Sequence, residues 1–245
     1  MGFSDIIPGI SGASIALITG IYESLIKNLK TTMSVRSFND IKKIPFSFFI
    51  PLGIGIIIAI IIGANFVGYL LEVQRSNTYA LFLGLIIASS ILIFKDVKQK
   101  KYFYALAGVL AGLLLGFLSV EITAQNYFIT TILGMIVILA MILPGISGSY
   151  VLLILGKYEY MINAIRTIDL ANIFFFILGG LITLFLAVKT LKKLLDKQLN
   201  QTISFFCGLM IGALTTIINE VYFNLQAVLF IILGAIIAFS IWKLK

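Results

Sequence analysis

The sequence predicts an all-α polytopic membrane protein built from two inverted-topology repeats, each a re-entrant helical hairpin followed by three transmembrane helices. Three observations lead to this fold class. Of the 245 residues, 60% are hydrophobic, against about 45–50% in soluble domains, and they lie in long apolar runs. The string PGISG occurs twice, each time before a hydrophobic segment. The basic residues gather in four short segments between apolar runs.

The two PGISG strings belong to a longer repeat. Ile6–Glu23 and Ile142–Glu159 align without a gap and share 11 of 18 residues. Proline disfavours helix in the residue before it, and glycine allows tight turns. In a membrane protein, a duplicated helix that Gly and Pro interrupt indicates a transport site at the interface between repeats.

The spans follow from apolar runs of roughly 20 residues, the length that crosses a bilayer. Only seven residues precede Pro8, about 10 Å of helix, so the first motif is expected to be re-entrant. In the first half we then expect spans at Pro45–Leu71, Thr78–Phe94 and Tyr102–Val120. In the second half we expect a hairpin of Tyr127–Leu143 and Gly148–Ile165, then spans at Asn172–Val188, Ile203–Asn219 and Leu225–Trp242.

Two further similarities extend the repeat beyond the motif. FLGLII at Phe82–Ile87 resembles FCGLMI at Phe206–Ile211, and FIPLG at Phe49–Gly53 more weakly resembles FFILG at Phe175–Gly179. Residues 1–123 and 124–245 are therefore interpreted as one ancestral unit present twice.

Charge predicts the orientation of the repeats. Of the 18 basic residues, 15 lie in residues 27–43, 95–101, 189–197 and 243–245. The positive-inside rule places these loops and the C-terminus in the cytoplasm. Three spans then separate the start of one half from the start of the other, so the halves are inverted. The net charge of +8 is interpreted as this orientation signal and not as a nucleic-acid surface.

The remaining basic residues, Arg75, Lys157 and Arg166, each lie near an acidic residue in the sequence.

A helix that begins at membrane depth presents free N–H groups and a partial positive charge, which together favour an anion. Ser11 and Ser147, or Ser14 and Ser149, are candidate N-caps. The candidate phosphate-binding residues are Gly9, Ser11, Gly12, Ser14, Gly145, Ser147, Gly148 and Ser149. The alternative is that these strings are tight turns or helix-packing sites. Packing is the expected role of Gly53, Gly55, Gly108, Gly112, Gly179 and Gly180.

Three acidic residues are candidates for gating or coupling. Glu23 and Glu159 end the two copies, near the membrane surface if each motif helix continues to them, and Asp5 precedes the first copy. Asp5 is equally compatible with a surface position, since Met141 takes its place in the second copy. Tyr22 and Tyr158 are expected to be interfacial anchors.

Two catalytic interpretations of the motif meet objections. GISG resembles the GxSG of rhomboid proteases, but the chain has no histidine to act as base. PGISGS resembles the PGxSRS segment of undecaprenyl-pyrophosphate phosphatases, but Gly12 and Gly148 replace the arginine that would stabilise a phosphoryl transition state. No catalytic residue, metal site or cofactor is expected.

The segments Asp5–Glu23 and Leu143–Glu159 resemble those of the PopT-type polyprenyl-phosphate transporters, and the resemblance covers nearly the whole chain. One departure is Ala13–Ser14, where that family commonly has Gly-Thr. The resemblance implies movement of undecaprenyl phosphate from the outer to the inner leaflet of the bacterial cytoplasmic membrane, by alternating access, for reuse in cell-wall synthesis. The implied partners are this lipid, membrane lipids and a coupling proton or sodium ion. The alternatives are a small-anion or ion-coupled secondary transporter and, less favoured, a lipid-pyrophosphate phosphatase.

Overall fold

The computed structural model describes residues 1–10, 12, 15–16, 19–21, 24–25, 27–28, 44–117, 126–141 and 147–244, with the backbone alone at 115–117, 184–197 and 216. Within these ranges the named elements are all α-helices, in agreement with the all-α prediction. Their bounds are α1 Gly2–Ile6, α4 Phe46–Val73, α5 Arg75–Asp96, α6 Tyr102–Phe117, α7 Tyr127–Met141, α8 Gly148–Ile154, α9 Tyr158–Arg166, α10 Leu170–Gly212, α11 Thr215–Ile218 and α12 Leu225–Lys243.

Three of these helices are long and apolar enough to cross a membrane, namely α4, α5 and α12. Each coincides within a few residues with a predicted span. The predicted spans at Tyr102–Val120 and Tyr127–Leu143 correspond to the shorter apolar helices α6 and α7. The chain is therefore a membrane protein with several apolar helices.

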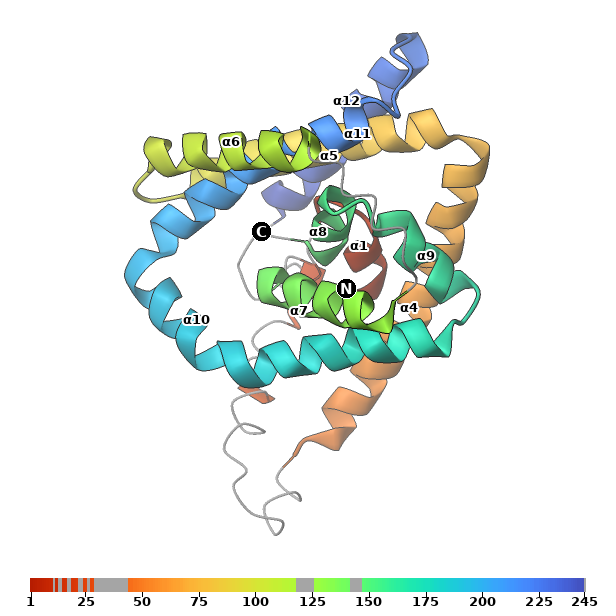
Figure 1. Ribbon diagram of the computed structural model, residues 1–245, viewed down its shortest axis with the longest axis vertical. Helices are drawn as coiled ribbons and strands as arrows, with labels where there is room; N and C mark the ends of the chain where they lie inside the picture. The colour runs from red at the N-terminus through yellow and green to blue at the C-terminus, as the bar shows by residue number, and fades with distance from the viewer. Residues whose placement is uncertain are drawn as a thin grey trace.

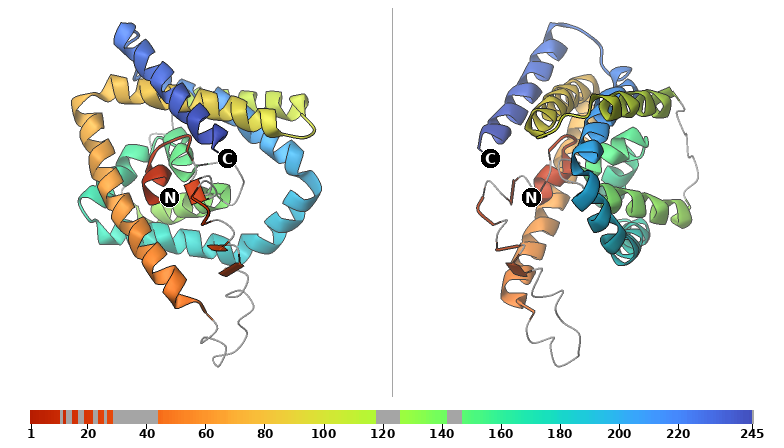
Figure 2. Two further views of the ribbon diagram at one scale, coloured as in Figure 1. Left: turned by 180° about the vertical axis from the view of Figure 1, so that it is seen from behind. Right: turned by 90° about the vertical axis from the view of Figure 1, so that its left-hand side faces the viewer.

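Long helices surround two short helices, α1 just before the first PGISG string and α8 at the second. α4 and α5 form two sides of a frame and the bent α10 forms the other two, with α1 and α8 seen within it in this view (Figure 1). The reverse view also places α1 inside this frame (Figure 2). All seven residues of α8 are buried, so the second motif helix belongs to the interior of the protein.

The structure corrects the prediction for residues 170–219. Two separate spans joined by a basic loop were expected there; α10 instead comprises two helical stretches that meet at a kink at Gln198, so the basic segment 189–197 is helix and not loop. The segment 189–197 contains Lys, Leu and Asp without Gly or Pro, a composition that permits helix. Gln198, with φ −135° and ψ 30°, interrupts the helical geometry. The span expected to reach Asn219 instead ends at Gly212, and α11 follows.

Glycines bring α5 and α12 into close contact. A Cβ at Gly84 would lie 1.9 Å from the carbonyl oxygen of Ile231, and a Cβ at Gly234 would lie 2.3 Å from that of Leu81. No side chain fits at such separations, so each glycine allows the neighbouring backbone to approach.

The same arrangement joins α6 and α10. A Cβ at Gly208 would lie 1.9 Å from the carbonyl oxygen of Ala105, and one at Gly108 would lie 1.9 Å from that of Phe205. Gly208 holds the position in FCGLMI that Gly84 holds in FLGLII. The two halves thus use one packing arrangement twice, each time between a helix of the first half and a helix of the second.

The packing role expected for six glycines is confirmed at four and wrong at two. Gly108, Gly112, Gly179 and Gly180 all face neighbouring atoms at distances too short for a side chain. Among the residues that the structure describes, nothing lies within 4 Å of a Cβ at Gly53 or Gly55. The reason is that these two glycines lie on a stretch of α4 whose apolar side chains, such as Ile54 and Ile57, are exposed.

Alanine substitution should separate these two classes of glycine. Gly84→Ala and Gly208→Ala each force apart a pair of backbones, and overpacking of this kind costs about 1–3 kcal/mol. We expect both variants to lower the melting temperature of the purified protein in detergent. Gly53→Ala is the matched control, since its methyl group meets open space and improves helix propensity by up to about 1 kcal/mol. Equal melting temperatures for all three variants would contradict the packing described here.

Candidate functional site

The second PGISG motif leads directly into α8. Ser147 is the N-cap of α8, with φ −94° and ψ 135°, as one of the two sequence alternatives predicted. Its hydroxyl makes no capping bond and instead lies 2.7 Å from the hydroxyl of Ser149. Both serines are buried. Two candidate phosphate ligands are therefore adjacent and shielded inside the protein.

In the first motif, Gly12 lies against the carboxylate of Asp5. The Gly12 N–H donates a hydrogen bond of 2.8 Å to Oδ1 of Asp5, and a Cβ at Gly12 would lie 2.5 Å from both carboxylate oxygens. Asp5 is half-buried and contacts the loop, so the alternative of an unconnected surface aspartate is wrong. The Gly12 N–H can therefore donate to an acceptor oxygen at this place.

In the second motif, the thioether of Met141 lies where the first motif has the Asp5 carboxylate. A Cβ at Gly148, the counterpart of Gly12, would lie 2.7 Å from Sδ of Met141, which is the counterpart of Asp5. The two copies therefore share one local arrangement and differ in the charge placed against it.

Each motif contacts the same position of the repeated helix segment. Gly9 adopts φ 91°, and a Cβ there would lie 3.3 Å from the backbone of Leu85 and Ile86. The Tyr150 hydroxyl donates to the carbonyl oxygen of Met210 at 2.6 Å. Met210 is the counterpart of Ile86 in the FLGLII and FCGLMI segments.

Both motif helices end in the same turn. Gly20 and Gly156 have φ of 73° and 62°, and glycine takes such values without strain. The Ile21 N–H donates to Ala16 O at 2.9 Å, and the Lys157 N–H donates to Leu152 O at 2.8 Å. This is the 6→1 bond of a Schellman cap.

The predicted single helix over Gly148–Ile165 is therefore wrong. It consists of α8 and α9, with the turn at Gly156 between them. Glu159 consequently lies in the first turn of α9 and not on the motif helix.

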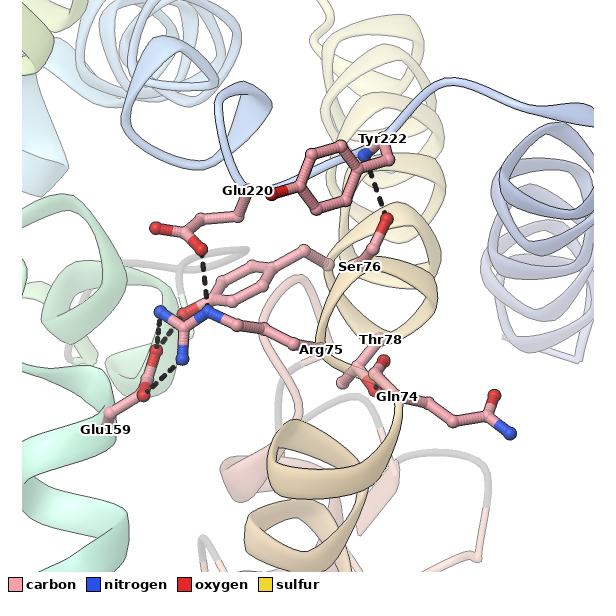
Figure 3. Close-up of polar contacts among 8 residues, drawn as sticks. Gln74, Arg75, Ser76, Thr78, Glu159, Glu220 and Tyr222 are labelled. Carbon is pink, nitrogen blue, oxygen red and sulfur yellow. Dashed lines mark hydrogen bonds and ion pairs between the residues drawn. The ribbon is translucent and has the colours of Figure 1, made fainter.

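Glu159 belongs to a cluster of ion pairs that joins the two halves. Arg75 donates to Glu159 through Nη1 at 2.9 Å and lies 2.8 Å from it through Nη2. Its Nε donates to Glu220 at 2.7 Å. The Tyr79 hydroxyl donates to Oε1 of Glu159, the oxygen that Nη2 of Arg75 also approaches. Figure 3 shows the guanidinium between the two carboxylates.

Tyr158 connects this cluster to the first motif. Its hydroxyl donates to the Ile6 carbonyl at 2.6 Å, and only 2% of its surface is exposed. The Phe82 ring packs edge-on against Tyr158 and Tyr79, with centroids 5.8 and 6.1 Å apart. The predicted role of Tyr158 as an interfacial anchor is therefore wrong, because its hydroxyl satisfies backbone inside the protein.

A second tie links α9 to α4. Arg166 pairs with Glu72, and this carboxylate raises the pKa of the guanidinium. A Cβ at Gly68 would lie 2.4 Å from Cδ of Arg166, so the glycine makes room for the arginine side chain. Sequence reasoning noted that Arg75 and Arg166 lie near acids but did not identify Glu220 or these partners, which are distant in sequence.

Four candidate site residues lie outside the described residues: Ser11, Ser14, Glu23 and Gly145. The part of the chain that the structure does describe brings the rest into two groups. Gly9, Gly12 and Asp5 surround the first loop, and Ser147, Gly148 and Ser149 begin α8. Glu159 lies apart from both, at the ion pairs.

Comparisons with known proteins find sequences similar to this chain. The sequence profile of a family described as undecaprenyl phosphate translocase-like matches residues 1–226. A polyprenyl-phosphate transporter of Vibrio cholerae serotype O1 is 33% identical over 228 residues, covering 89% of this chain and 74% of the relative. A polyprenyl-phosphate transporter of Staphylococcus aureus is 29% identical over 273 residues, covering 100% and 93%. No solved structure matches significantly.

The contact between Asp5 and Gly12 predicts a compensating pair of substitutions. Gly12→Ala places a methyl group against the Asp5 carboxylate, and we expect a loss of about 1–3 kcal/mol of stability. Asp5→Ala removes that carboxylate, so the double variant should recover part of the loss. Thermal unfolding in detergent measures both effects. A double variant that is less stable than the two single losses combined would contradict the contact.

Proposed function

Because this chain belongs to the undecaprenyl phosphate translocase-like family, we propose that it transports polyprenyl phosphate, undecaprenyl phosphate above all, across the bacterial cytoplasmic membrane. The proposed direction is from the outer to the inner leaflet, which returns the lipid carrier for cell-wall synthesis. The proposed orientation has the C-terminus and the lysine-rich segments in the cytoplasm, by the positive-inside rule.

The observation that carries this proposal is the position of the first motif along α5. Gly9 packs on Leu85 and Ile86, which are the two central residues of a 22-residue helix long enough to cross a membrane. We infer that, with α5 spanning the membrane, a loop at this place lies near the middle of the bilayer. Irregular backbone is stable there only inside protein or beside a cavity, and such interrupted helices hold substrate in transporters.

The chemistry of the substrate suits such a site. A phosphate headgroup carries a charge that lipid does not solvate, whereas a polyprenyl tail can remain in the lipid throughout. The protein therefore has to supply hydrogen-bond donors to the headgroup alone. We assign this task to Gly9, Ser11, Gly12, Ser14, Gly145, Ser147, Gly148 and Ser149.

We further propose that residues 1–123 and 124–245 are inverted repeats, each beginning with a re-entrant hairpin, and that they work by alternating access. The paired glycine contacts and the paired Schellman turns support an internal repeat, and the distribution of basic residues supports the inversion. Asp5, Glu23 and Glu159 are the proposed gating or coupling residues, with a proton or a sodium ion as the coupling ion.

A small-anion transporter is the second candidate, because donors that bind a phosphate headgroup also bind a soluble phosphate. Nothing in the hydroxyl pair of Ser147 and Ser149 selects for a lipid tail. The curated relatives are named as transporters, which supports transport over the phosphatase alternative.

Removing the buried hydroxyl should impair transport. Ser147→Ala is expected to slow translocation about 10- to 100-fold, since a hydrogen bond to a charged group contributes about 1.5–3 kcal/mol. The assay is the movement of labelled undecaprenyl phosphate between leaflets in proteoliposomes. Ser240→Ala, which removes an exposed hydroxyl on α12, is the control and should leave the rate unchanged.

The same vesicles separate the alternatives. Loss of lipid movement in Ser147→Ala, with wild-type melting behaviour, supports the proposed function. Uptake of soluble phosphate without lipid movement would favour the small-anion transporter. Release of phosphate from undecaprenyl pyrophosphate by the purified wild-type protein would establish the phosphatase instead.

A further inference from the structure

The ion pairs around Arg75 join the first half of the chain to the second. Arg75 begins α5, and the carboxylates that it binds come from α9 and from the segment between α11 and α12. Tyr222, in that same segment, donates its N–H to the hydroxyl of Ser76 at 2.9 Å. The turn between α4 and α5 is thus tied at three points to the second half of the chain (Figure 3).

We propose that Arg75 is a gating residue, and that its bonds to Glu159 and Glu220 close one end of the path to the motifs. The proposal rests on the proposed transport function and adds to it the residues that control access from one side. The basic segments 95–101 and 243–245 belong to the far ends of α5 and α12. In the proposed orientation this gate therefore faces the outer leaflet.

A continuous set of contacts connects the gate to both motifs. Glu159 directly follows Tyr158, whose hydroxyl holds the Ile6 carbonyl just before the first PGISG string. Tyr158 in turn follows the Schellman turn that ends α8, the helix of the second motif. Displacement of α9 from Arg75 would therefore move groups that touch each motif.

The strength of the tie suits a gate. The side chains of Arg75, Glu159 and Glu220 are 46%, 42% and 39% exposed, and ion pairs at such exposure contribute little to stability. The bidentate geometry gives the closed state a defined arrangement. Such a tie holds one conformation while remaining easy to break.

Thiol labelling tests the gate without any substrate. In a Cys207→Ala background, Ser149→Cys places a probe at the start of α8, where the wild-type serine is buried. Arg75→Gln should speed its labelling by a water-soluble maleimide about fivefold, the scale of shift that loss of exposed ion pairs supports. Arg75→Lys keeps the charge but not the two-pronged geometry, so its rate should be intermediate.

The control probe is Ser204→Cys, at a fully buried position on the face of α10 that meets Lys101 of the first half. Its labelling should not change with Arg75→Gln. Unchanged labelling at position 149 would overturn the gate. Faster labelling at both positions would also overturn it, because Arg75 would then be holding the fold together.

A reversible cross-link supplies the second test. Ser76→Cys with Tyr222→Cys should form a disulfide that locks this end, stop lipid movement in proteoliposomes and release it on reduction. Full lipid movement in the oxidised protein would overturn the gate. If wild-type protein moves no lipid at all, the proposed function fails, and the labelling rates alone decide the gate.

Discussion

Backbone that leaves the helical hydrogen-bond pattern inside a membrane must find its partners within the protein, and the structure depends on meeting this requirement. The described residues of the two motifs lie against the helices α5 and α10 of the fold. Asp5 accepts the Gly12 N–H, Tyr158 donates to the Ile6 carbonyl, and Schellman turns close both motif helices. These partners belong to the short helices α1 and α9 and to the motif segments themselves.

The frame makes this interior possible by packing its helices at backbone distance. Gly84 and Gly208 each admit a carbonyl oxygen of a partner helix where a Cβ would collide. Because each pair joins a helix of the first half to one of the second, the halves are interleaved. The same geometry sets the depth of the first motif, which lies against the centre of α5.

The sequence predicted the all-α class and several spans because apolar length is a local signal. Apolar runs in the sequence predicted the spans at α4, α5 and α12, and the serine after the Pro-Gly pair predicted the N-cap at Ser147. The break at Gly156 was missed, although the two copies share this glycine and the polar residues Lys157 and Glu159 follow it. The helical conformation of residues 189–197 was missed because a run of charge was interpreted as a loop, whereas lysine is a good helix former. The partners of Arg75 join residues 84 and 145 positions apart, and no local pattern in one sequence shows such a contact.

One measurement tests the central claim directly: an experimental structure of the full chain with undecaprenyl phosphate bound in a lipid nanodisc. The account predicts a single phosphate between the motifs, within about 2.7–3.2 Å of the Ser147 hydroxyl, with the tail leaving toward lipid. A phosphate bound elsewhere, with Ser147 and Ser149 still paired to each other and out of its reach, would contradict it.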